Sequence, residues 1–516
     1  MPVSFPDVTL NIVPGVELAT SEEQRILVVG QMLSGTATSG ELVQNIADTD
    51  TAINALFGQR SHIANMIRKV KDVNRNTRVD AIPLDDGGSA TQATATIALS
   101  GTATAAGRYY VTLVSRTNHR VAVDIASGDT ANSAATKINA AITGATNYGD
   151  APFTSAVATN TVTATAANGG TLANTWHVEV ESTVPGLSVT VTGWTGGATD
   201  PSVTNVLDVT GSQRYQTVVW PEVYDLSVVR AWIDDRFNVT NGIENGTVIS
   251  NRVDTMANIV SEANGLNSQN IVILSDQIVN APARKGSMLR EMPDVTTALV
   301  GGIRSLRLTA DSNVTQFVTT TEPRDQFGGD HFATLPYANT QVTGIQPPLP
   351  EDDWSADEMD DLEEAGASVV TANRTYTNVI MGEFVTTYKT DSAGNPDTSY
   401  KFLNTVDAVS VTRERFVLNL RRRYAQTRLT SGELIPQLAM ANESSIFGFL
   451  TQVRADLVDD GILQAGEEAE ADFERTTTVS ITSLSQGRVS VAMAPLLVGQ
   501  LRALIGTITV NFGSNV

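Results

Sequence analysis

The chain has 516 residues, of which 41% are hydrophobic, and it carries a formal net charge of −22 with no cysteine. This length exceeds one hydrophobic core, so about two to four domains are expected. The charge argues against direct nucleic-acid binding and against adhesion to anionic lipid. Without a run of about 18 apolar residues, or a basic start followed by an apolar stretch, neither a membrane span nor a Sec signal is expected. The absence of cysteine fits folding in a reducing cytoplasm.

The same charge constrains self-association. Like-charged subunits repel at long range, and this repulsion is screened beyond about 10 Å at 0.1 M salt. An ordered polymer of this chain would therefore need locally complementary patches, and its assembly would depend on salt.

Residues 1–20 predict an extended arm. The apolar Val8, Leu10 and Ile12 alternate with Thr9 and Asn11, and prolines bracket the run. Alternation with period two is typical of a half-buried strand, and the flanking prolines argue against its extension into a compact domain.

Residues 21–86 predict the first part of an α/β domain. Arg25–Gly30 and Val79–Leu84 are expected to be buried strands. Between them, Thr51–Phe57 and Ser61–Val73 have the apolar spacing of helices.

The α/β pattern returns over residues 206–350. We expect a strand at Thr217–Trp220, a helix that starts at Pro221, a second helix near Arg252–Ala263 and a strand at Asn270–Ser275. Alternating strands and helices predict a mostly parallel sheet with crossover helices.

Residues 87–205 differ because about half of them are Ala, Thr or Gly and few are charged. Several short runs alternate, and one helix fits between them, with Asp129 or Thr130 as its cap and Ala134, Ile138 and Ile142 as its apolar stripe. This pattern predicts a mainly β outer domain inserted into the α/β domain.

Residues 351–504 predict a second α/β domain. It opens with a helix whose capping box is Ser355 and Glu358 and which ends near Gly366. A strand pair with a polar loop follows, and then helices near 405–424, 445–459 and 495–504. Residues 505–516 close the chain with a second arm, an amphipathic strand in which Ile508, Val510 and Phe512 face one way.

No catalytic site is apparent. A subtilisin-type site needs Asp, His and Ser in that order, with Ser in a tight Gly-rich turn. The four histidines are His62, His119, His177 and His331, and no such turn occurs, so each is interpreted as a surface or packing residue. Gly30 and Gly35 have the spacing of a phosphate loop but lack its Lys. The carboxylates form no EF-hand loop, so neither a metal nor a cofactor is expected.

Three segments carry a resemblance to a known family. They are EFVTTYKTDSAGNPDTSYKFLNTVDAVSVTRERFVLNLRRRY (Glu383–Tyr424), ALFGQRSHIANMIRKVKDVNRNTRVDAIPLDD (Ala55–Asp86) and Pro495–Phe512. In order and spacing they resemble the tail sheath subunits of contractile bacteriophages, of the Mu-like branch.

The resemblance implies a structural virion protein and not an enzyme. Such subunits form stacked hexameric rings around a tail tube and contract to drive the tube through the host envelope during genome delivery. Their partners are copies of themselves, the tube protein, and the baseplate and tail terminator proteins. The sheath would be assembled in the host cytoplasm and would not insert into a membrane. Terminal strands in this family join neighbouring subunits, which would assign that role to Val8–Val13 and Ile505–Phe512 here.

Two charged faces are candidates for docking between subunits or onto the tube. One is acidic, with Asp357, Asp360, Asp361 and Glu364. The other is basic, with Arg413, Arg421, Arg422 and Arg423. The simpler alternative for both is a solvated helix face, as the alternative for the terminal strands is pairing inside their own chain.

Other functions stay open at this point. One is an α/β hydrolase-like enzyme, which would need a polar cluster. A second is a capsid, adhesin or surface-layer protein, suggested by the Ala/Thr-rich segment. A third is the sheath of a phage-derived bacteriocin instead of a virion.

Overall fold

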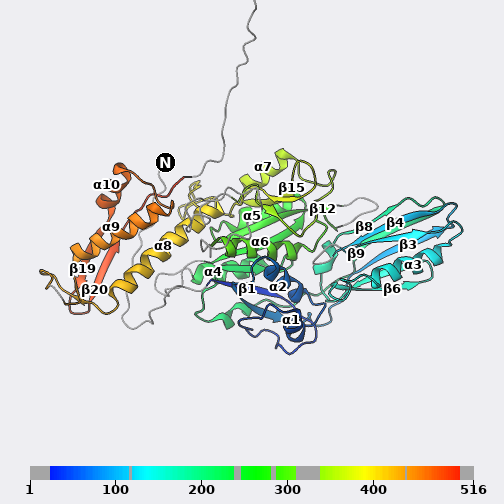
Figure 1. Cartoon of the computed structure of the whole chain (residues 1–516), viewed down its shortest axis with the longest axis horizontal. Helices are drawn as coiled ribbons and strands as arrows, with labels where there is room; N and C mark the ends of the chain where they lie inside the picture. The colour runs from blue at the N-terminus through cyan, green and yellow to red at the C-terminus, as the bar shows by residue number, and fades with distance from the viewer. Residues whose placement is uncertain are drawn as a thin grey trace, which may run out of the picture.

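The structure is a computed structural model that describes residues 24–114, 119–236, 246–279, 286–308, 337–435 and 438–499. Figure 1 shows an elongated molecule with a central α/β body, a mainly β unit at one end and a largely helical unit at the other. Both predicted arms, 1–20 and 505–516, and also His331, lie outside the described residues. None of the described helices combines the length and the apolar character that crossing a membrane requires.

A mixed sheet forms the central body. Its strands lie in the order β14 (Gln341–Val342), β16 (Val379–Met381), β15 (Ala367–Ala372), β12 (Ile271–Val279), β11 (Thr247–Asp254), β10 (Thr217–Trp220), β1 (Arg25–Gln31) and β2 (Arg78–Leu84). All neighbours from β15 to β2 are parallel. β16 and β14 continue antiparallel, and β13 (Gly286–Ser287) pairs with the end of β12. Parallel neighbours need crossover connections, which the intervening helices supply.

Helices cover both faces of this sheet. In β1, Ile26 and Val28 pack toward α1 (Asp50–Phe57), α2 (His62–Val73) and α6 (Pro293–Leu308). Leu27 and Val29 pack toward the opposite layer of α4 (Leu226–Arg236), α5 (Met256–Leu266) and α7 (Ala356–Ala365). Successive side chains of a strand point to opposite faces, so a continuous apolar run needs cover on both sides.

Close approach of α6 to the sheet depends on a glycine. A Cβ added to Gly301 would lie 2.9 Å from Val219 Cγ2 on β10. Any larger residue there would push the helix away from the strand or displace Val219.

Most predicted elements of the central body are confirmed, and two need correction. Pro221 does not begin a helix: Tyr224 N–H donates to the Pro221 carbonyl in a turn, and α4 starts at Leu226. The helix expected near Arg252–Ala263 starts only at Met256, because residues up to Asp254 belong to β11 and pair with β12. The second half of this strand contains polar Asn, Arg and Asp residues, so the sequence there lacks the apolar pattern that predicts a buried strand.

The β unit consists of β3 to β9 and α3. One antiparallel sheet has the order β6-β7-β3-β9 and the other β5-β4-β8. The bounds are β3 Thr94–Gly101, β4 Gly107–Leu113, β5 His119–Ile125, α3 Ala131–Thr143, β6 Phe153–Ala158, β7 Thr161–Ala166, β8 Val178–Ser182 and β9 Leu187–Thr195. Thr130 caps α3, and the predicted stripe of that helix is buried. The strand β6 was not predicted from the sequence.

The largely helical unit follows the long helix α8 (Leu403–Tyr424), which also reaches into the central body. Its other elements are β17 (Arg428–Leu429), β18 (Met440–Ala441), α9 (Glu443–Asp459), α10 (Glu467–Thr476), β19 (Thr478–Ser483) and β20 (Arg488–Ala492). Phe416 and Leu420 of α8 pack in its core with Leu450 and Phe473. The unit is therefore built around the second half of α8.

Three further expectations can be compared with this part of the chain. The capping box of α7 and its left-handed end at Gly366 (φ +86°) are confirmed. The strand pair expected after Glu383 is reduced to two isolated antiparallel bridges, Val385 with Phe402 and Thr390 with Pro396. The helix expected near 495–504 is wrong for its described part, 495–499, where Leu497 instead bridges Leu463.

A buried ion pair fixes the start of α8 to the central body. Arg304 of α6 donates from NH2 to Asp407 Oδ1 at 2.6 Å, and Tyr337 O–H donates to Asp407 Oδ2 at 2.7 Å. Arg304 NH1 also donates to Thr217 Oγ1 at 2.8 Å. Both charged side chains are almost completely buried, so this junction is stable only while both partners are present.

Replacing Asp407 by Ala should therefore lower the apparent free energy of unfolding by about 3–5 kcal/mol, because it leaves Arg304 buried without a counter-charge. The measurement is urea denaturation followed by tryptophan fluorescence. The matched control is Asp361→Ala on the exposed face of α7, expected to change stability by less than about 0.5 kcal/mol. Equal effects of the two substitutions would show that the pair does not secure the junction.

Candidate functional site

The first candidate site is the carboxyl edge of the parallel sheet between β1 and β10. The chain runs from β1 to β2 on one side and from β10 to β11 on the other, so the strand order reverses there. Open α/β sheets bind their ligands in the crevice outside such a reversal point.

A loop of the β unit fills this crevice. Gln31 Nε2, at the end of β1, donates to the Gly169 carbonyl at 2.8 Å. Asn168 Nδ2 donates to Asp86 Oδ1 at 2.9 Å, and Asn168 Oδ1 accepts from the His62 N–H at 2.9 Å. These protein atoms occupy the place that a ligand takes in a ligand-binding α/β protein.

His62 and Asp294 form a buried pair at the same edge, with His62 Nε2 2.9 Å from Asp294 Oδ2. Catalytic use of such a pair requires a nucleophile on the other ring nitrogen. His62 Nδ1 has no hydrogen-bond partner in the part of the chain that the structure describes, and a Cβ on Gly30 would lie 3.1 Å from it. The pair therefore serves packing. The same holds for His119 and His177, which are also buried.

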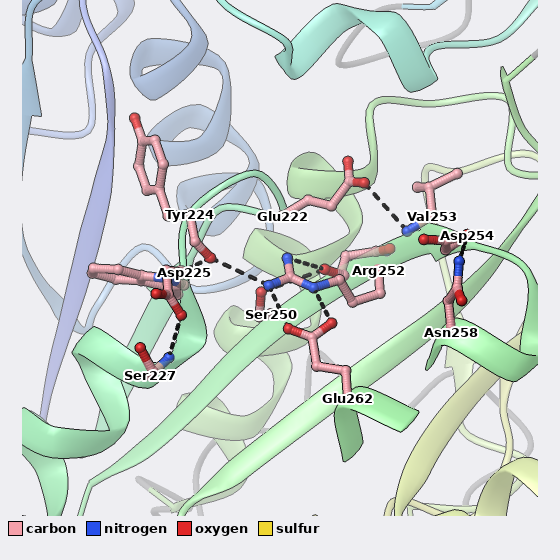
Figure 2. Close-up of polar contacts among 12 residues, drawn as sticks. Glu222, Tyr224, Asp225, Ser227, Ser250, Arg252, Val253, Asp254, Asn258 and Glu262 are labelled. Atoms are coloured by element: carbon pink, nitrogen blue, oxygen red, sulfur yellow. Dashed lines mark hydrogen bonds and ion pairs between the residues drawn. The ribbon is translucent and has the colours of Figure 1, made fainter. Parts of the chain in front are cut away.

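Glu222 is buried next to this pair. Its backbone N–H donates to Asp294 Oδ1 at 2.7 Å, and its side-chain Oε2 lies 3.1 Å from Thr175 Oγ1 of the β unit. Arg252 faces Glu222, but its guanidinium forks onto Glu262, at 2.5 and 2.8 Å (Figure 2). Burial, followed by the charge of Asp294, raises the pKa of Glu222 to about 8, against the opposing effect of Arg252.

Two more buried carboxyls line the same side of the sheet. Burial raises the pKa of Asp276 to about 7, although Asp276 accepts hydrogen bonds from Ser287 and from the Met288 N–H. Burial likewise raises the pKa of Glu291 to about 8, opposed by the hydrogen bond from the Gln346 N–H. Near neutral pH, buried carboxyl groups at this edge of the sheet therefore carry protons.

Sequence reasoning did not single out these acids. Glu222 and Asp276 end or follow short apolar runs, and Asp294 begins a helix after Pro293. An acid at or shortly after the end of a buried apolar run is a usable signal, since such a residue lies toward the carboxyl edge of the sheet. The contact of Glu222 with Thr175, 47 positions earlier in the chain, leaves no signal in the local sequence.

The second candidate site is the hairpin of β19 and β20. Within the described residues these strands pair only with each other, so each has an outer edge free of a neighbouring strand. On the β19 side, Glu443 accepts the Ile481 N–H. Beside β20 runs a groove lined by Leu420, Tyr424, Leu429, Ile446, Val489 and Val491.

Exposed apolar side chains gather in the same unit. Of the large apolar side chains that are exposed in the described ranges, all except Val209 and Tyr376 lie there, namely Leu434, Ile435, Leu438, Leu484 and Val498. Exposed apolar surface of this kind is typical of an interaction site.

The two charged faces lie on different parts of the molecule. The acidic residues Asp357, Asp360, Asp361 and Glu364 are exposed on α7, on the central body. Arg422 and Arg423 are exposed at the end of α8, Arg421 and Arg413 are half-buried, and Figure 1 shows that end of α8 well apart from α7. The two faces do not meet within one chain.

Stability should fall as the pH rises from about 5 to 9. The folded pKa values near 8, 7 and 8 for Glu222, Asp276 and Glu291 exceed the ordinary values of 4.5, 3.8 and 4.5, so the native state binds more protons in this window. Their stabilisation is complete below the ordinary values and is lost as the pH passes about 8, with a slope of about 1.4 kcal/mol per pH unit for each titrating carboxyl.

Urea denaturation of the full chain across this pH range measures the slope, and Glu291→Gln should reduce it. A midpoint that is constant or rises toward pH 9 would contradict the assignment.

Comparisons with known proteins agree with the resemblance predicted from the sequence. No family model matches the chain. Over 488 residues, 93% of its length, the chain is 24% identical to a Mu-like prophage FluMu tail sheath protein of Haemophilus influenzae, of which it covers 91%.

Two solved structures that align with this chain are described as sheath proteins. A sheath tail protein from Desulfitobacterium hafniense aligns over 95% of this chain and 98% of that chain, at 12% identity and a TM-score of 0.47. The helical sheath of the anti-feeding prophage in its contracted state aligns over 97% of this chain and 100% of that chain, at 11% identity and a TM-score of 0.48. Along 93% of its length, this chain is therefore similar to a Mu-like tail sheath protein.

Proposed function

We propose that the chain is the structural subunit of a contractile tail sheath. It polymerises as stacked hexameric rings around a tail tube and contracts to drive the tube through a host envelope during genome delivery. The carrying observation is the similarity to a tail sheath protein along 93% of the chain. The sheet edge supports the same proposal, because Asn168 and Gly169 of the β unit take up hydrogen-bonding groups there that a substrate would otherwise meet.

In this proposal the subunit belongs to a virion or phage-like tail assembled in the host cytoplasm. Its partners are further copies of itself, the tail tube, and the baseplate and terminator proteins. No cofactor takes part, because the work of contraction comes from new contacts between subunits.

Helix α8 connects the central body with the largely helical unit and would transmit motion between them. Leu403 at its start packs in the core of the central body, and Phe416 and Leu420 pack in the core of the largely helical unit. Its 22 residues span about 33 Å at 1.5 Å per residue. Because the ion pair of Asp407 and Arg304 fixes the start of α8 to the central body, a movement of the central body would also move the largely helical unit.

The hairpin of β19 and β20 is the proposed acceptor for the terminal strands of neighbouring copies. An added strand would pair with an open edge through backbone hydrogen bonds, each contributing about 0.5–1.5 kcal/mol before the cost of ordering the strand. The apolar groove beside β20 would take alternate side chains, Val8, Leu10 and Ile12 from one arm or Ile508, Val510 and Phe512 from the other.

Truncation before Ile505 should abolish polymerisation if the last strand links the subunits. Negative-stain electron microscopy of the full chain should show long striated tubes, and the truncated chain should show dispersed particles. Tubes from both proteins would place the linkage elsewhere.

A matched pair of variants separates the strand's two faces. Ile508→Lys with Val510→Lys should prevent tubes, because it charges the face that enters the groove. Thr507→Lys with Thr509→Lys adds the same charge to the other face and should leave tubes intact. Equal loss in both variants would indicate a general effect of charge on the arm.

The charged faces are proposed to meet between subunits, the acidic face of α7 against the Arg-rich end of α8 of another copy. Arg422→Glu with Arg423→Glu should reduce the sedimenting fraction at about 0.05 M salt and less so at about 0.5 M, since salt screens exposed charges. Adding Asp360→Arg and Asp361→Arg to the same chain should restore assembly. Normal assembly of the first variant at low salt would show that both faces are only solvated.

A further inference from the structure

We propose that Glu222 and Asp294 form a proton-operated latch between the β unit and the central body. With one proton held by the pair, the segment Leu172–His177 of the β unit stays closed on the sheet edge. Loss of that proton to solvent opens this seam.

The position of the proton follows from the hydrogen bonds around Asp294. Asp294 accepts the Glu222 N–H at 2.7 Å and lies 2.9 Å from His62 Nε2. A doubly protonated His62 would bury an N–H at Nδ1, for which the described residues offer no acceptor. The arrangement that fits these contacts has His62 donating from Nε2 to Asp294. A second buried anion beside Asp294 is unfavourable, so the proton resides on Glu222.

The charged groups around Glu222 do not offset a second negative charge. Asp294 faces it from α6 and Arg252 from β11, and Arg252 is already held by both oxygens of Glu262 (Figure 2). The charges of Asp86 and Asp200 bear on the neighbouring Tyr224. The β unit contributes the uncharged hydroxyl of Thr175 to Glu222.

The closed seam depends on Thr175 because its hydroxyl joins the two bodies. Thr175 Oγ1 donates to Glu222 Oε2 at 3.1 Å and also lies 3.4 Å from the Leu172 carbonyl. The next residue, Trp176, packs in the aromatic core of the β unit, and its carbonyl lies so close to Gly286 that a Cβ there would come within 2.2 Å. With Glu222 ionised, two adjacent anions are buried under this segment, and water entering the seam relieves their repulsion.

The latch would decide whether the β unit moves with the central body or independently of it. If the chain is a sheath subunit, opening would rearrange the β unit at one end of the molecule while leaving the hairpin of β19 and β20 at the other end untouched. The latch itself does not require the sheath function, so its test stands if that function fails.

Hydrogen–deuterium exchange of the full chain between pH 6 and 9.5 tests the latch, after correction for the intrinsic exchange rate. Protection of peptides covering Leu172–His177 should fall about ten-fold per pH unit above pH 8 in the wild type. Glu222→Gln, which cannot ionise, should stay protected throughout. If that variant does not fold, Glu222→Met also lacks the charge and serves in its place.

The matched control is Glu181→Gln, an exposed residue of β8 paired with Arg120, which should open as the wild type does. Opening of the Glu222 variant at the same pH as the wild type would overturn the latch, and so would a wild type that stays protected to pH 9.5.

Discussion

A parallel sheet covered by helices on both faces leaves one place for function, its carboxyl edge, and in this protein that edge is closed. The loop at Asn168 and Gly169 supplies the hydrogen-bond partners of Gln31, Asp86 and His62. Closure from within the chain buries the carboxyls at this edge, and burial raises the pKa values of Glu222, Asp276 and Glu291. It also moves the surfaces available for function to the outer parts of the molecule.

The two ends of the molecule differ in what they present. The β unit joins the central body through buried polar contacts and through Met292 and Val295, which pack in its core. The largely helical unit instead exposes apolar side chains, an apolar groove and the open edges of a hairpin. If this highly acidic chain polymerises as proposed, it needs contacts that do not depend on net charge, and backbone pairing on this hairpin would supply them.

Sequence patterns predicted those elements whose signal is local. The apolar run of β1, the stripe of α3 and the capping box of α7 each depend on spacing within a few residues, and the structure confirms them. Predictions failed where tertiary contacts decide: β11 is a strand despite its polar residues because β12 pairs with it. Pro221 begins a turn closed by the Tyr224 N–H, and not a helix.

The candidate site was less predictable than the fold. Neither the buried ion pair of Arg304 and Asp407 nor the contact between Glu222 and Thr175 leaves a trace in local spacing, because the partners are 103 and 47 positions apart. Which charged residues are buried can be recognised only after the helices and the sheet have been placed in three dimensions. The family resemblance, in contrast, was readable because it depends on the order of motifs along the chain.

The central claim, that copies of this chain are joined by strands added to the hairpin of β19 and β20, is tested most directly by a cryo-electron microscopy reconstruction of the assembled polymer in which strands are resolved. The account predicts a strand from another copy hydrogen-bonded to an outer edge of β19 or β20, with its apolar side chains in the groove beside Val489 and Val491. A polymer in which both outer edges remain without a partner strand would contradict it.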